Sequence, residues 1–310
     1  MAVGSRPLVP SRLAPGTGHA RRGTATSSVA AYVALTKPRI IELLLITTVP
    51  TMVLADRGWP STWLVLVTLV GGTLAAGGAN AINMYVDRDI DRLMLRTRNR
   101  PLVTGAIAPR DALTFALVLE AVAFVVLWAG ANLLSAVLAL SATAFYVGVY
   151  TLWLKRTSTQ NIVIGGAAGA VPVLVGWAAV TNDLAWAPVV LFGAMFFWTP
   201  PHFWALAIRY ADDYRAANVP MLPAVVPFEH AVRQMVGHTV AMVACTLLLV
   251  RVADLGALYT VTAVVLGGVF IAATLLLRQW PTPANSMRLF GYSITYVTLL
   301  FAALTLDVLL

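Results

Sequence analysis

Residues 63–91, WLVLVTLVGGTLAAGGANAINMYVDRDID, combine a long apolar run with regularly spaced polar side chains at its end. The first part, residues 63–86, has no charged side chain. An apolar run of about 20 residues is the length at which an α-helix spans a bilayer core. Asn83, Asp87 and Asp91 then follow at the end of the run. The stretch therefore predicts a transmembrane helix with acidic side chains where it leaves the membrane.

Apolar runs of the same kind recur along the whole chain. Only 11% of the 310 residues are charged, whereas soluble domains have roughly 25% charged residues. The predicted spans are residues 40–55, 63–86, 112–129, 133–154, 161–180, 186–208, 233–253, 256–277 and 289–309. We therefore predict an all-α fold, a polytopic membrane protein whose domain, residues 31–310, has about nine transmembrane helices.

The lysines and arginines predict how the spans are oriented. With a cytoplasmic N-terminus and an outer C-terminus, 19 of the 21 lie on the cytoplasmic side, and only Arg57 and Arg251 lie outside, as is typical of membrane proteins. This topology accounts for the net charge of +8, so no nucleic-acid partner is expected. Residues 1–30 lack acidic side chains and indicate a disordered cytoplasmic tail, the alternative being an organellar transit peptide. We expect the inner membrane of a bacterium, with the mitochondrial inner membrane as the alternative.

Asn83, Asp87 and Asp91 are spaced four residues apart, so on an α-helix they share one face. Two carboxylates and an amide oxygen arranged in this way suit Mg²⁺, which takes one or two carboxylates together with substrate phosphates. Asp89 falls on another face. The alternative is a solvated helix end where the acids pair with nearby arginines, but carboxylates are disfavoured at the negative end of a helix dipole. The pattern favours a metal site.

Three arginines, Arg96, Arg98 and Arg100, alternate in the loop that follows. Guanidinium groups can converge on an anion, although the orientation rule alone would also place arginines here. Beside a Mg²⁺ site they favour a diphosphate, whose charge the metal and the arginines share. Lys155, which ends the fourth span on the same side, is either a further phosphate contact or a membrane anchor.

A second polar loop follows the sixth span and begins with Asp212 and Asp213. Its position, four spans after the first loop, indicates a weak internal repeat with two half-sites across a central cavity that opens to the cytoplasmic side. His202, about two turns earlier, is a functional candidate because it is ionisable within a span, or else it bonds a carbonyl freed by Pro201. Glu120 is near mid-membrane and should be protonated or bonded to another helix.

The motif Asn83-x-x-x-Asp87-x-x-x-Asp91, at the end of the second of about nine spans, resembles that of the UbiA superfamily of membrane prenyltransferases. Several further sequence stretches resemble the branch of this superfamily that farnesylates heme. The stretches that carry this resemblance are LTKPRI (35–40), RTRNRPL (96–102), TPPHFWALA (199–207), YADDY (210–214) and NVPMLP (218–223). The superfamily often repeats Asp-x-x-x-Asp in the second loop, whereas Ala216 and Ala217 stand at that distance here, so a second metal, on Asp212, is less firmly indicated.

The resemblance implies transfer of the farnesyl group of farnesyl diphosphate to a vinyl group of heme B, with addition of water, giving heme O and diphosphate. Mg²⁺ and the basic side chains would stabilise the departing diphosphate. Aromatic faces would attract the allylic cation. The candidate aromatic residues are Tyr146, Tyr150, Trp198, Phe203 and Trp204. His202 is the candidate contact for the heme iron or a propionate, and heme A synthase is the implied partner enzyme.

Three rival functions are weighed against the placement and composition of these polar groups. A related prenyltransferase acting on a quinone precursor or a chlorin would have the same site. A secondary transporter would have polar groups near the bilayer midplane on broken helices, whereas here they lie at the ends of spans. A heme carrier would leave Asn83, Asp87 and Asp91 without a purpose.

Overall fold

The computed structural model describes residues 28–310, without the side chains of residues 39, 40 and 42–44. This part of the chain is helical and contains no strand, as predicted. Most of the predicted tail, residues 1–30, lies outside the described residues. Its last three residues form the first turn of α1 (Ser28–Thr36), which packs Ala31 and Leu35 against the bundle.

All nine predicted spans correspond to long helical segments. These are α2 (Pro38–Asp56), α3 (Thr62–Val86), α6 (Pro109–Gly130), the continuous rod α7–η1–α8 (Leu133–Thr157), α9 (Asn161–Thr181), α10 (Trp186–Arg209), α13 (Phe228–Val252), α14 (Ala257–Gln279) and α15 (Pro283–Leu309). Within the described residues, eight are long and apolar enough to cross a membrane, while the apolar part of α2, Leu45–Asp56, is shorter. The chain is therefore a multi-pass membrane protein.

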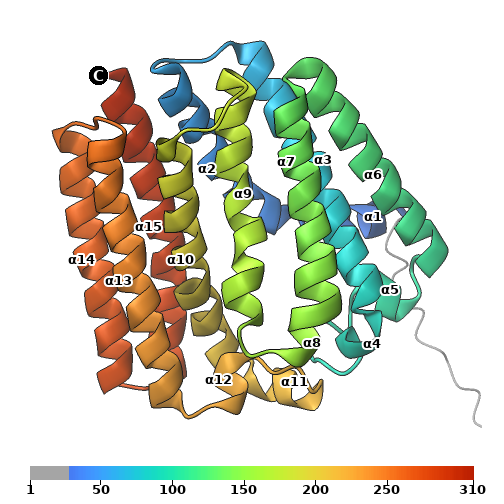
Figure 1. Cartoon of the computed structure of the whole chain (residues 1–310). Helices are drawn as coiled ribbons and strands as arrows, with labels where there is room; N and C mark the ends of the chain where they lie inside the picture. Colours follow the sequence, from blue (N-terminus) through green and yellow to red (C-terminus); the bar gives the residue numbers. More distant parts are fainter. Residues whose placement is uncertain (1–27) are drawn as a thin grey trace, which may run out of the picture.

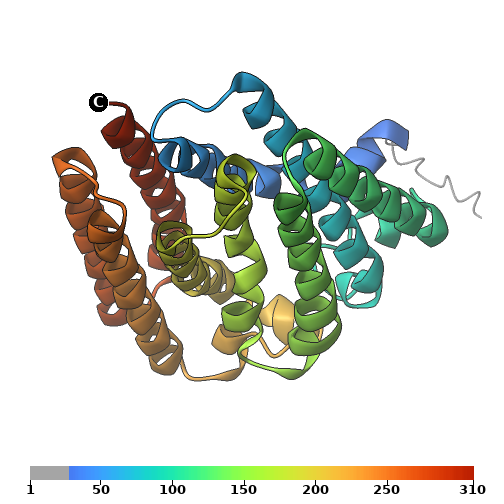
Figure 2. The same cartoon turned by 45° about the horizontal axis from the view of Figure 1, so that its top comes forward.

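The helices stand side by side, with α13, α14 and α15 on one side of the bundle and α3, α6 and α7 on the other (Figure 1). The tilted view places α2, α9 and α10 between these two groups (Figure 2). Four short helices gather at one end, here called the polar end: α4 (Arg88–Asp91), α8 (Lys155–Thr157), α11 (Ala211–Ala216) and α12 (Leu222–Val225). Because α3, the α7 rod and α10 all end there, their last residues are brought together.

Close helix contacts and exposed tryptophans fit a bundle that lies in lipid. A Cβ at Gly176 would lie 2.7 Å from the carbonyl oxygen of Thr48, so only glycine lets α9 approach α2 this closely. Exposed tryptophans lie at both ends of the bundle, for example Trp63 and Trp186 at the starts of helices, and Trp153 and Trp280 towards the polar end. Tryptophan at both boundaries is typical of membrane proteins.

The fourth span differs from the regular helix that its apolar pattern predicts. It begins as α7 (Leu133–Ala144) and widens into the π-helix η1 (Phe145–Leu154). Thr151 Oγ1 donates a hydrogen bond to the carbonyl oxygen of Tyr146, five residues earlier, at 2.8 Å. In a π-helix residues about five apart face the same side, and such turns are frequent at functional sites.

Candidate active site

The end of α3 buries the three polar side chains that the sequence singled out. Asn83, Asp87 and Asp91 are 3%, 0% and 1% exposed. The backbone N–H of Asp87 bonds Asn83 O and that of Asp91 bonds Asp87 O, both at 2.9 Å, so helical spacing continues from α3 through α4. The three side chains are therefore stacked in a buried cluster, here called the acidic nest (Asn83, Asp87, Asp91).

Asp89, which the spacing places on another face, does point away from the acidic nest. Its carboxylate forms two hydrogen bonds of 2.7 Å with the guanidinium of Arg156. Hydrogen bonding by Arg156 lowers the pKa of Asp89 to about 2. Asp89 and Arg156 thus tie α4 to α8.

Two of the cations predicted to bind phosphate contact the acidic nest. Lys155 Nζ pairs with Asp87 Oδ2, and Arg100 donates to Asp91 Oδ2 at 2.6 Å. Buried carboxylates need such partners, because burying an unpaired charge costs far more free energy than burying a paired one. Arg98 is exposed. Of the three alternating arginines, only Arg100 has a side chain that pairs with the nest.

One oxygen of the nest lacks a donor. Asp87 Oδ1 is buried and makes no hydrogen bond, and Arg156 is 3.8 Å from it. An unsatisfied buried carboxylate oxygen is costly and is the kind of group that a cation satisfies. Among residues 28–310 no group of three His, Cys, Asp or Glu side chains could hold a metal alone. The donor set fits Mg²⁺, which takes few carboxylates and completes its shell with water and phosphate.

Lys37, which was not among the predicted site residues, reaches the acidic nest. Its Nζ donates to Asn83 Oδ1 at 2.8 Å. Its backbone is in the left-handed region, with φ 54°, directly before Pro38. Burial lowers the pKa of Lys37 well below its usual value, and nearby Arg100 and Lys155 lower it further. A strained backbone is a feature of functional sites. The sequence signal that could have indicated Lys37 is its position before Pro38 in the LTKPRI stretch, residues 35–40.

The second polar loop contacts the first through Asp213. Its Oδ2 accepts a hydrogen bond of 3.0 Å from the backbone N–H of Arg96, whose guanidinium lies over the Tyr210 ring at 5.6 Å. Asp212, the predicted second metal ligand, is 98% exposed and pairs with Arg215 at 2.6 Å. Neighbouring residues on a helix point about 100° apart, so only one of the two acids can face the first loop. The structure does not bring Asp212 to the acidic nest.

The π-helix presents aromatic side chains beside the nest. The rings of Tyr146 and Tyr150 stack with centroids 5.3 Å apart and planes 13° apart. A Cβ at Gly165 on α9 would lie 2.4 Å from Tyr150, so the glycine makes room for that ring. Both tyrosines were predicted to line the pocket of an allylic cation, and the structure places them on η1, between Ala144 and Lys155.

His202 lies in the interface between α10 and α15. Its ring stacks between Trp198, at 4.1 Å, and Phe290, at 4.7 Å, and its Nδ1 is 2.6 Å from Ser293 Oγ. The alternative that His202 bonds a carbonyl freed by Pro201 is wrong, because its partner is a serine hydroxyl. Trp204, also predicted in the site, is fully buried. No contact among the described residues joins it to the acidic nest.

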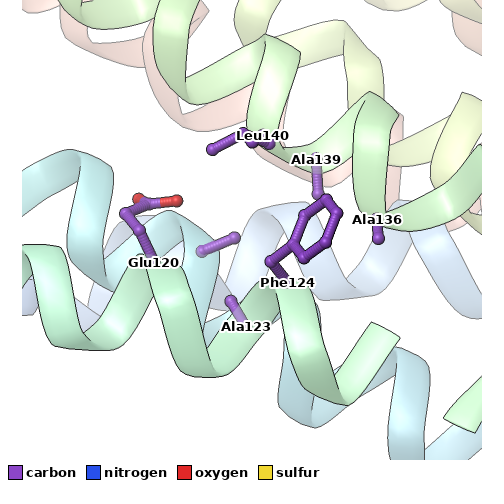
Figure 3. A pocket seen from close by; sticks show the side chains of 7 residues that line it. Glu120, Ala123, Phe124, Ala136, Ala139 and Leu140 are labelled. Atoms are coloured by element: carbon purple, nitrogen blue, oxygen red, sulfur yellow. The ribbon is translucent and has the colours of Figure 1, made fainter. Parts of the chain in front are cut away.

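Glu120 is buried between three helices, away from the acidic nest. It accepts a hydrogen bond of 3.1 Å from Thr143 on α7. Glu120 was expected to be protonated or bonded to another helix, and the bond to another helix is present. A Cβ at Gly78 on α3 would lie 2.6 Å from Glu120 Oε1. Figure 3 shows Glu120 beside a small pocket that Phe124 of α6 and Ala136, Ala139 and Leu140 of α7 line.

Comparison with known proteins places this geometry in a family context. A model of the UbiA prenyltransferase family matches residues 44–303. A protoheme IX farnesyltransferase of Frankia alni is 56% identical over 282 residues, which cover 90% of this chain and 97% of that protein.

Solved structures share the fold at low sequence identity. A digeranylgeranylglyceryl phosphate synthase superposes with a TM-score of 0.75 at 17% identity, covering 91% of this chain and 99% of that one. A UbiA homolog from Archaeoglobus fulgidus, bound to DMAPP and Mg²⁺, superposes with a TM-score of 0.62 at 19% identity, covering 88% and 99%.

Proposed function

This chain belongs to the UbiA prenyltransferase family, and from that premise we propose that it farnesylates heme B. The reaction joins farnesyl diphosphate, heme B and water to give heme O and diphosphate. The farnesyl C1–O bond breaks, a C–C bond to a heme vinyl carbon forms, and water adds as a hydroxyl. The protoheme IX farnesyltransferase that is 56% identical over nearly its whole length supports this substrate pair.

Asn83, Asp87 and Asp91 would hold Mg²⁺ through their side-chain oxygens. The ion, when bound, supplies positive charge that neutralises the diphosphate as it leaves. The observation that carries this assignment is Asp87 Oδ1, which is buried and accepts no hydrogen bond, and whose one ion pair, with Arg156, is long at 3.8 Å, so a closer cation would satisfy it. The choice of ion is supported by the fold that this chain shares with a UbiA homolog solved with Mg²⁺.

The basic side chains around the nest bind and orient the diphosphate. Lys155 and Arg100 are held by Asp87 and Asp91, and Lys37 by Asn83, so three basic side chains converge from separate segments. Prearranged charge of this kind stabilises a leaving group without reorganising during the reaction. The N–H of Arg96 bonds Asp213, which holds this part of the loop at the polar end.

The aromatic side chains and the apolar helices provide the rest of the environment. The stacked rings of Tyr146 and Tyr150 would stabilise an allylic cation that forms beside the nest. The farnesyl chain lies among apolar helices, where water is scarce. His202, whose Nδ1 contacts Ser293, has Nε2 available for the heme iron or a propionate.

Purified protein tests the function directly. It is incubated with heme B and farnesyl diphosphate, with and without Mg²⁺, and the heme is analysed by mass. Heme O should form only with Mg²⁺, and Asp87→Asn and Asp91→Asn should lower the rate on the order of a hundredfold or more. Farnesylation of a hydroxybenzoate-type acceptor in preference to heme B would instead favour the quinone-precursor alternative.

The location and partners follow from the same proposal. We place the polar end on the cytoplasmic side of a bacterial inner membrane, with the C-terminus outside, because nearly all lysines and arginines of residues 28–310 lie at that end. Heme A synthase, a membrane enzyme that oxidises heme O, is the proposed consumer of the product. Reporter fusions after Thr157 and Leu310 test the orientation, and an outer location for the fusion at Thr157 would contradict it.

A further inference from the structure

Thr151 is a buried hydroxyl of η1 that contacts the acidic nest from another helix. It is 0% exposed, and its Oγ1 lies 3.1 Å from Asn83 Nδ2, across 68 residues of sequence. We propose that Thr151 is a positioning residue that orients the Asn83 amide so that its oxygen, and not its NH₂ group, faces the cation. This inference rests on the proposed Mg²⁺ site.

The directions of the hydrogen bonds around Asn83 fix the orientation of its side-chain amide. Thr151 has one hydroxyl hydrogen, and it is donated to Tyr146 O at 2.8 Å. Its oxygen can therefore only accept from Asn83. The other amide hydrogen of Asn83 is donated to Asp87 Oδ2 at 2.8 Å. Both hydrogens are committed, so Asn83 Oδ1 must point the other way.

A flipped amide would be electrostatically unfavourable. It would place Asn83 Oδ1 against the carboxylate oxygen of Asp87 and against a hydroxyl oxygen whose hydrogen is already used. The amide oxygen would then face two other hydrogen-bond acceptors, and the amide NH₂ group would face the Nζ group of Lys37. In the observed orientation, Lys37 Nζ lies 2.8 Å from Asn83 Oδ1. A hydrogen-bond donor therefore already contacts the oxygen that the cation would use.

Thr151 donates its hydroxyl hydrogen within its own helix. In a regular helix a threonine hydroxyl bonds the carbonyl three or four residues earlier, as Thr239 does with Met235. In η1, Thr151 bonds Tyr146, five residues earlier. The hydroxyl hydrogen is thus committed within η1, and the oxygen lone pairs remain for Asn83. Side chains that orient a metal ligand typically contribute 10–100-fold to metal affinity.

The test measures metal affinity without turnover. Mn²⁺, a spectroscopic substitute for Mg²⁺, is titrated by electron paramagnetic resonance into the full-length protein in detergent with inorganic diphosphate present. We expect Thr151→Val and Thr151→Ala to raise the Kd for Mn²⁺ about tenfold or more, and Thr151→Ser to recover most of the lost affinity. Thr274→Val is the matched control, because Thr274 is a buried threonine on α14 that bonds Phe270 O.

A double-mutant cycle separates positioning from damage to the fold. An aspartate at position 83 has an oxygen on both sides and needs no orientation, so Thr151→Val should have little further effect in an Asn83→Asp background. An equal loss in both backgrounds would mean that Thr151 acts only on packing, and wild-type affinity in Thr151→Val and Thr151→Ala would equally overturn the inference.

The proposed metal site has its own outcome in this experiment. Asp87→Asn should abolish Mn²⁺ binding. If Asp87→Asn binds as the parent does, the metal site itself is refuted. If Asp87→Asn loses binding while Thr151→Val keeps it, the metal site stands and only the role of Thr151 is lost.

Discussion

Asp213 accepts a hydrogen bond from the backbone N–H of Arg96 at 3.0 Å, and this contact joins two loops that are 117 residues apart in sequence. The contact holds the loop before Arg100 against α11. One carboxylate oxygen of Asp213 is thus used on a backbone donor of the first loop.

Asp213→Ala should therefore weaken substrate binding more than Asp212→Ala does. Removing the acceptor frees the loop of Arg96 and Arg100, and we expect KM for farnesyl diphosphate to rise about tenfold, the effect of roughly 1.4 kcal/mol lost from a charge-assisted hydrogen bond. Asp212 is exposed and pairs with Arg215, so its removal should change KM little. A larger loss in Asp212→Ala would restore Asp212 as the predicted metal ligand.

Asp89 provides a contrast within the first motif. Asp89→Asn should leave the rate of farnesyl transfer within a fewfold of the parent, because its carboxylate points to Arg156 and away from the nest. The pKa of Asp89 is lowered to about 2, so its pairing with Arg156 stabilises the fold above its unfolded pKa, near 4. That contribution is lost as the pH falls through about 2.

Thermal unfolding in detergent between pH 6 and pH 2.5 checks this assignment. The pair is partly exposed, so its contribution should be below about 1 kcal/mol and should shrink in salt. Activity that collapses in Asp89→Asn at neutral pH would move Asp89 into the acidic nest.

Lys37→Met should lower kcat/KM for farnesyl diphosphate about tenfold to a hundredfold, because one of three convergent basic side chains is removed. Arg57 is the matched control. It also has a left-handed backbone, with φ 55°, but at the opposite end of α2, where it donates to Ala253 O at 2.7 Å. Arg57→Met should affect stability and not kcat/KM. Steady-state kinetics at saturating heme B separates the two, and equal losses in both variants would remove Lys37 from the site.

His202→Ala should abolish the spectrum of histidine-bound heme if Nε2 contacts the iron. Ser293 Oγ donates to Phe290 O at 2.6 Å, so it accepts from His202 Nδ1–H and leaves Nε2 unprotonated. Ser293→Ala should weaken heme affinity about tenfold. Ser286→Ala is the control on the same helix, because Ser286 is also buried but bonds Pro283 O. An unchanged spectrum in His202→Ala leaves a propionate contact or a packing role.

The sequence predicted the acidic nest because its geometry is local. Residues four apart on any α-helix share a face, so the stacking of Asn83, Asp87 and Asp91 required no knowledge of the other helices. The same is true of Asp89, which the spacing assigned to another face. The existence and order of the spans were equally accessible, because the length of an apolar run is a property of the run alone.

The missed features all depend on contacts between distant segments. Lys37 became part of the site only because α1 and α2 meet at a strained residue beside α3. The π-helix was missed because a continuous apolar run does not distinguish a π-helix from an α-helix. Asp212 and Asp213 are adjacent, and only the position of the first loop decides which one it contacts.

Gly78→Ala is predicted to destabilise the protein by about 1–3 kcal/mol, the usual cost of overpacking a buried contact. The added Cβ would lie 2.6 Å from Glu120 Oε1 and 3.0 Å from its Cδ. Glu120 would have to move from Thr143 on α7, to which it is bonded. Gly72→Ala is the control on the same helix, because nothing lies within 4 Å of a Cβ there, and alanine favours a helix by about 1 kcal/mol.

The double variant Gly78→Ala/Glu120→Asp decides whether the clash is the cause. A shorter carboxylate relieves the contact, so the double variant should be more stable than the sum of its single changes predicts. Thermal unfolding in detergent measures all four proteins. Because α3 carries the acidic nest and α7 leads into η1, displacing Glu120 should also raise KM for farnesyl diphosphate. Additive losses with an unchanged KM would show that Glu120 does not set the spacing of these two helices.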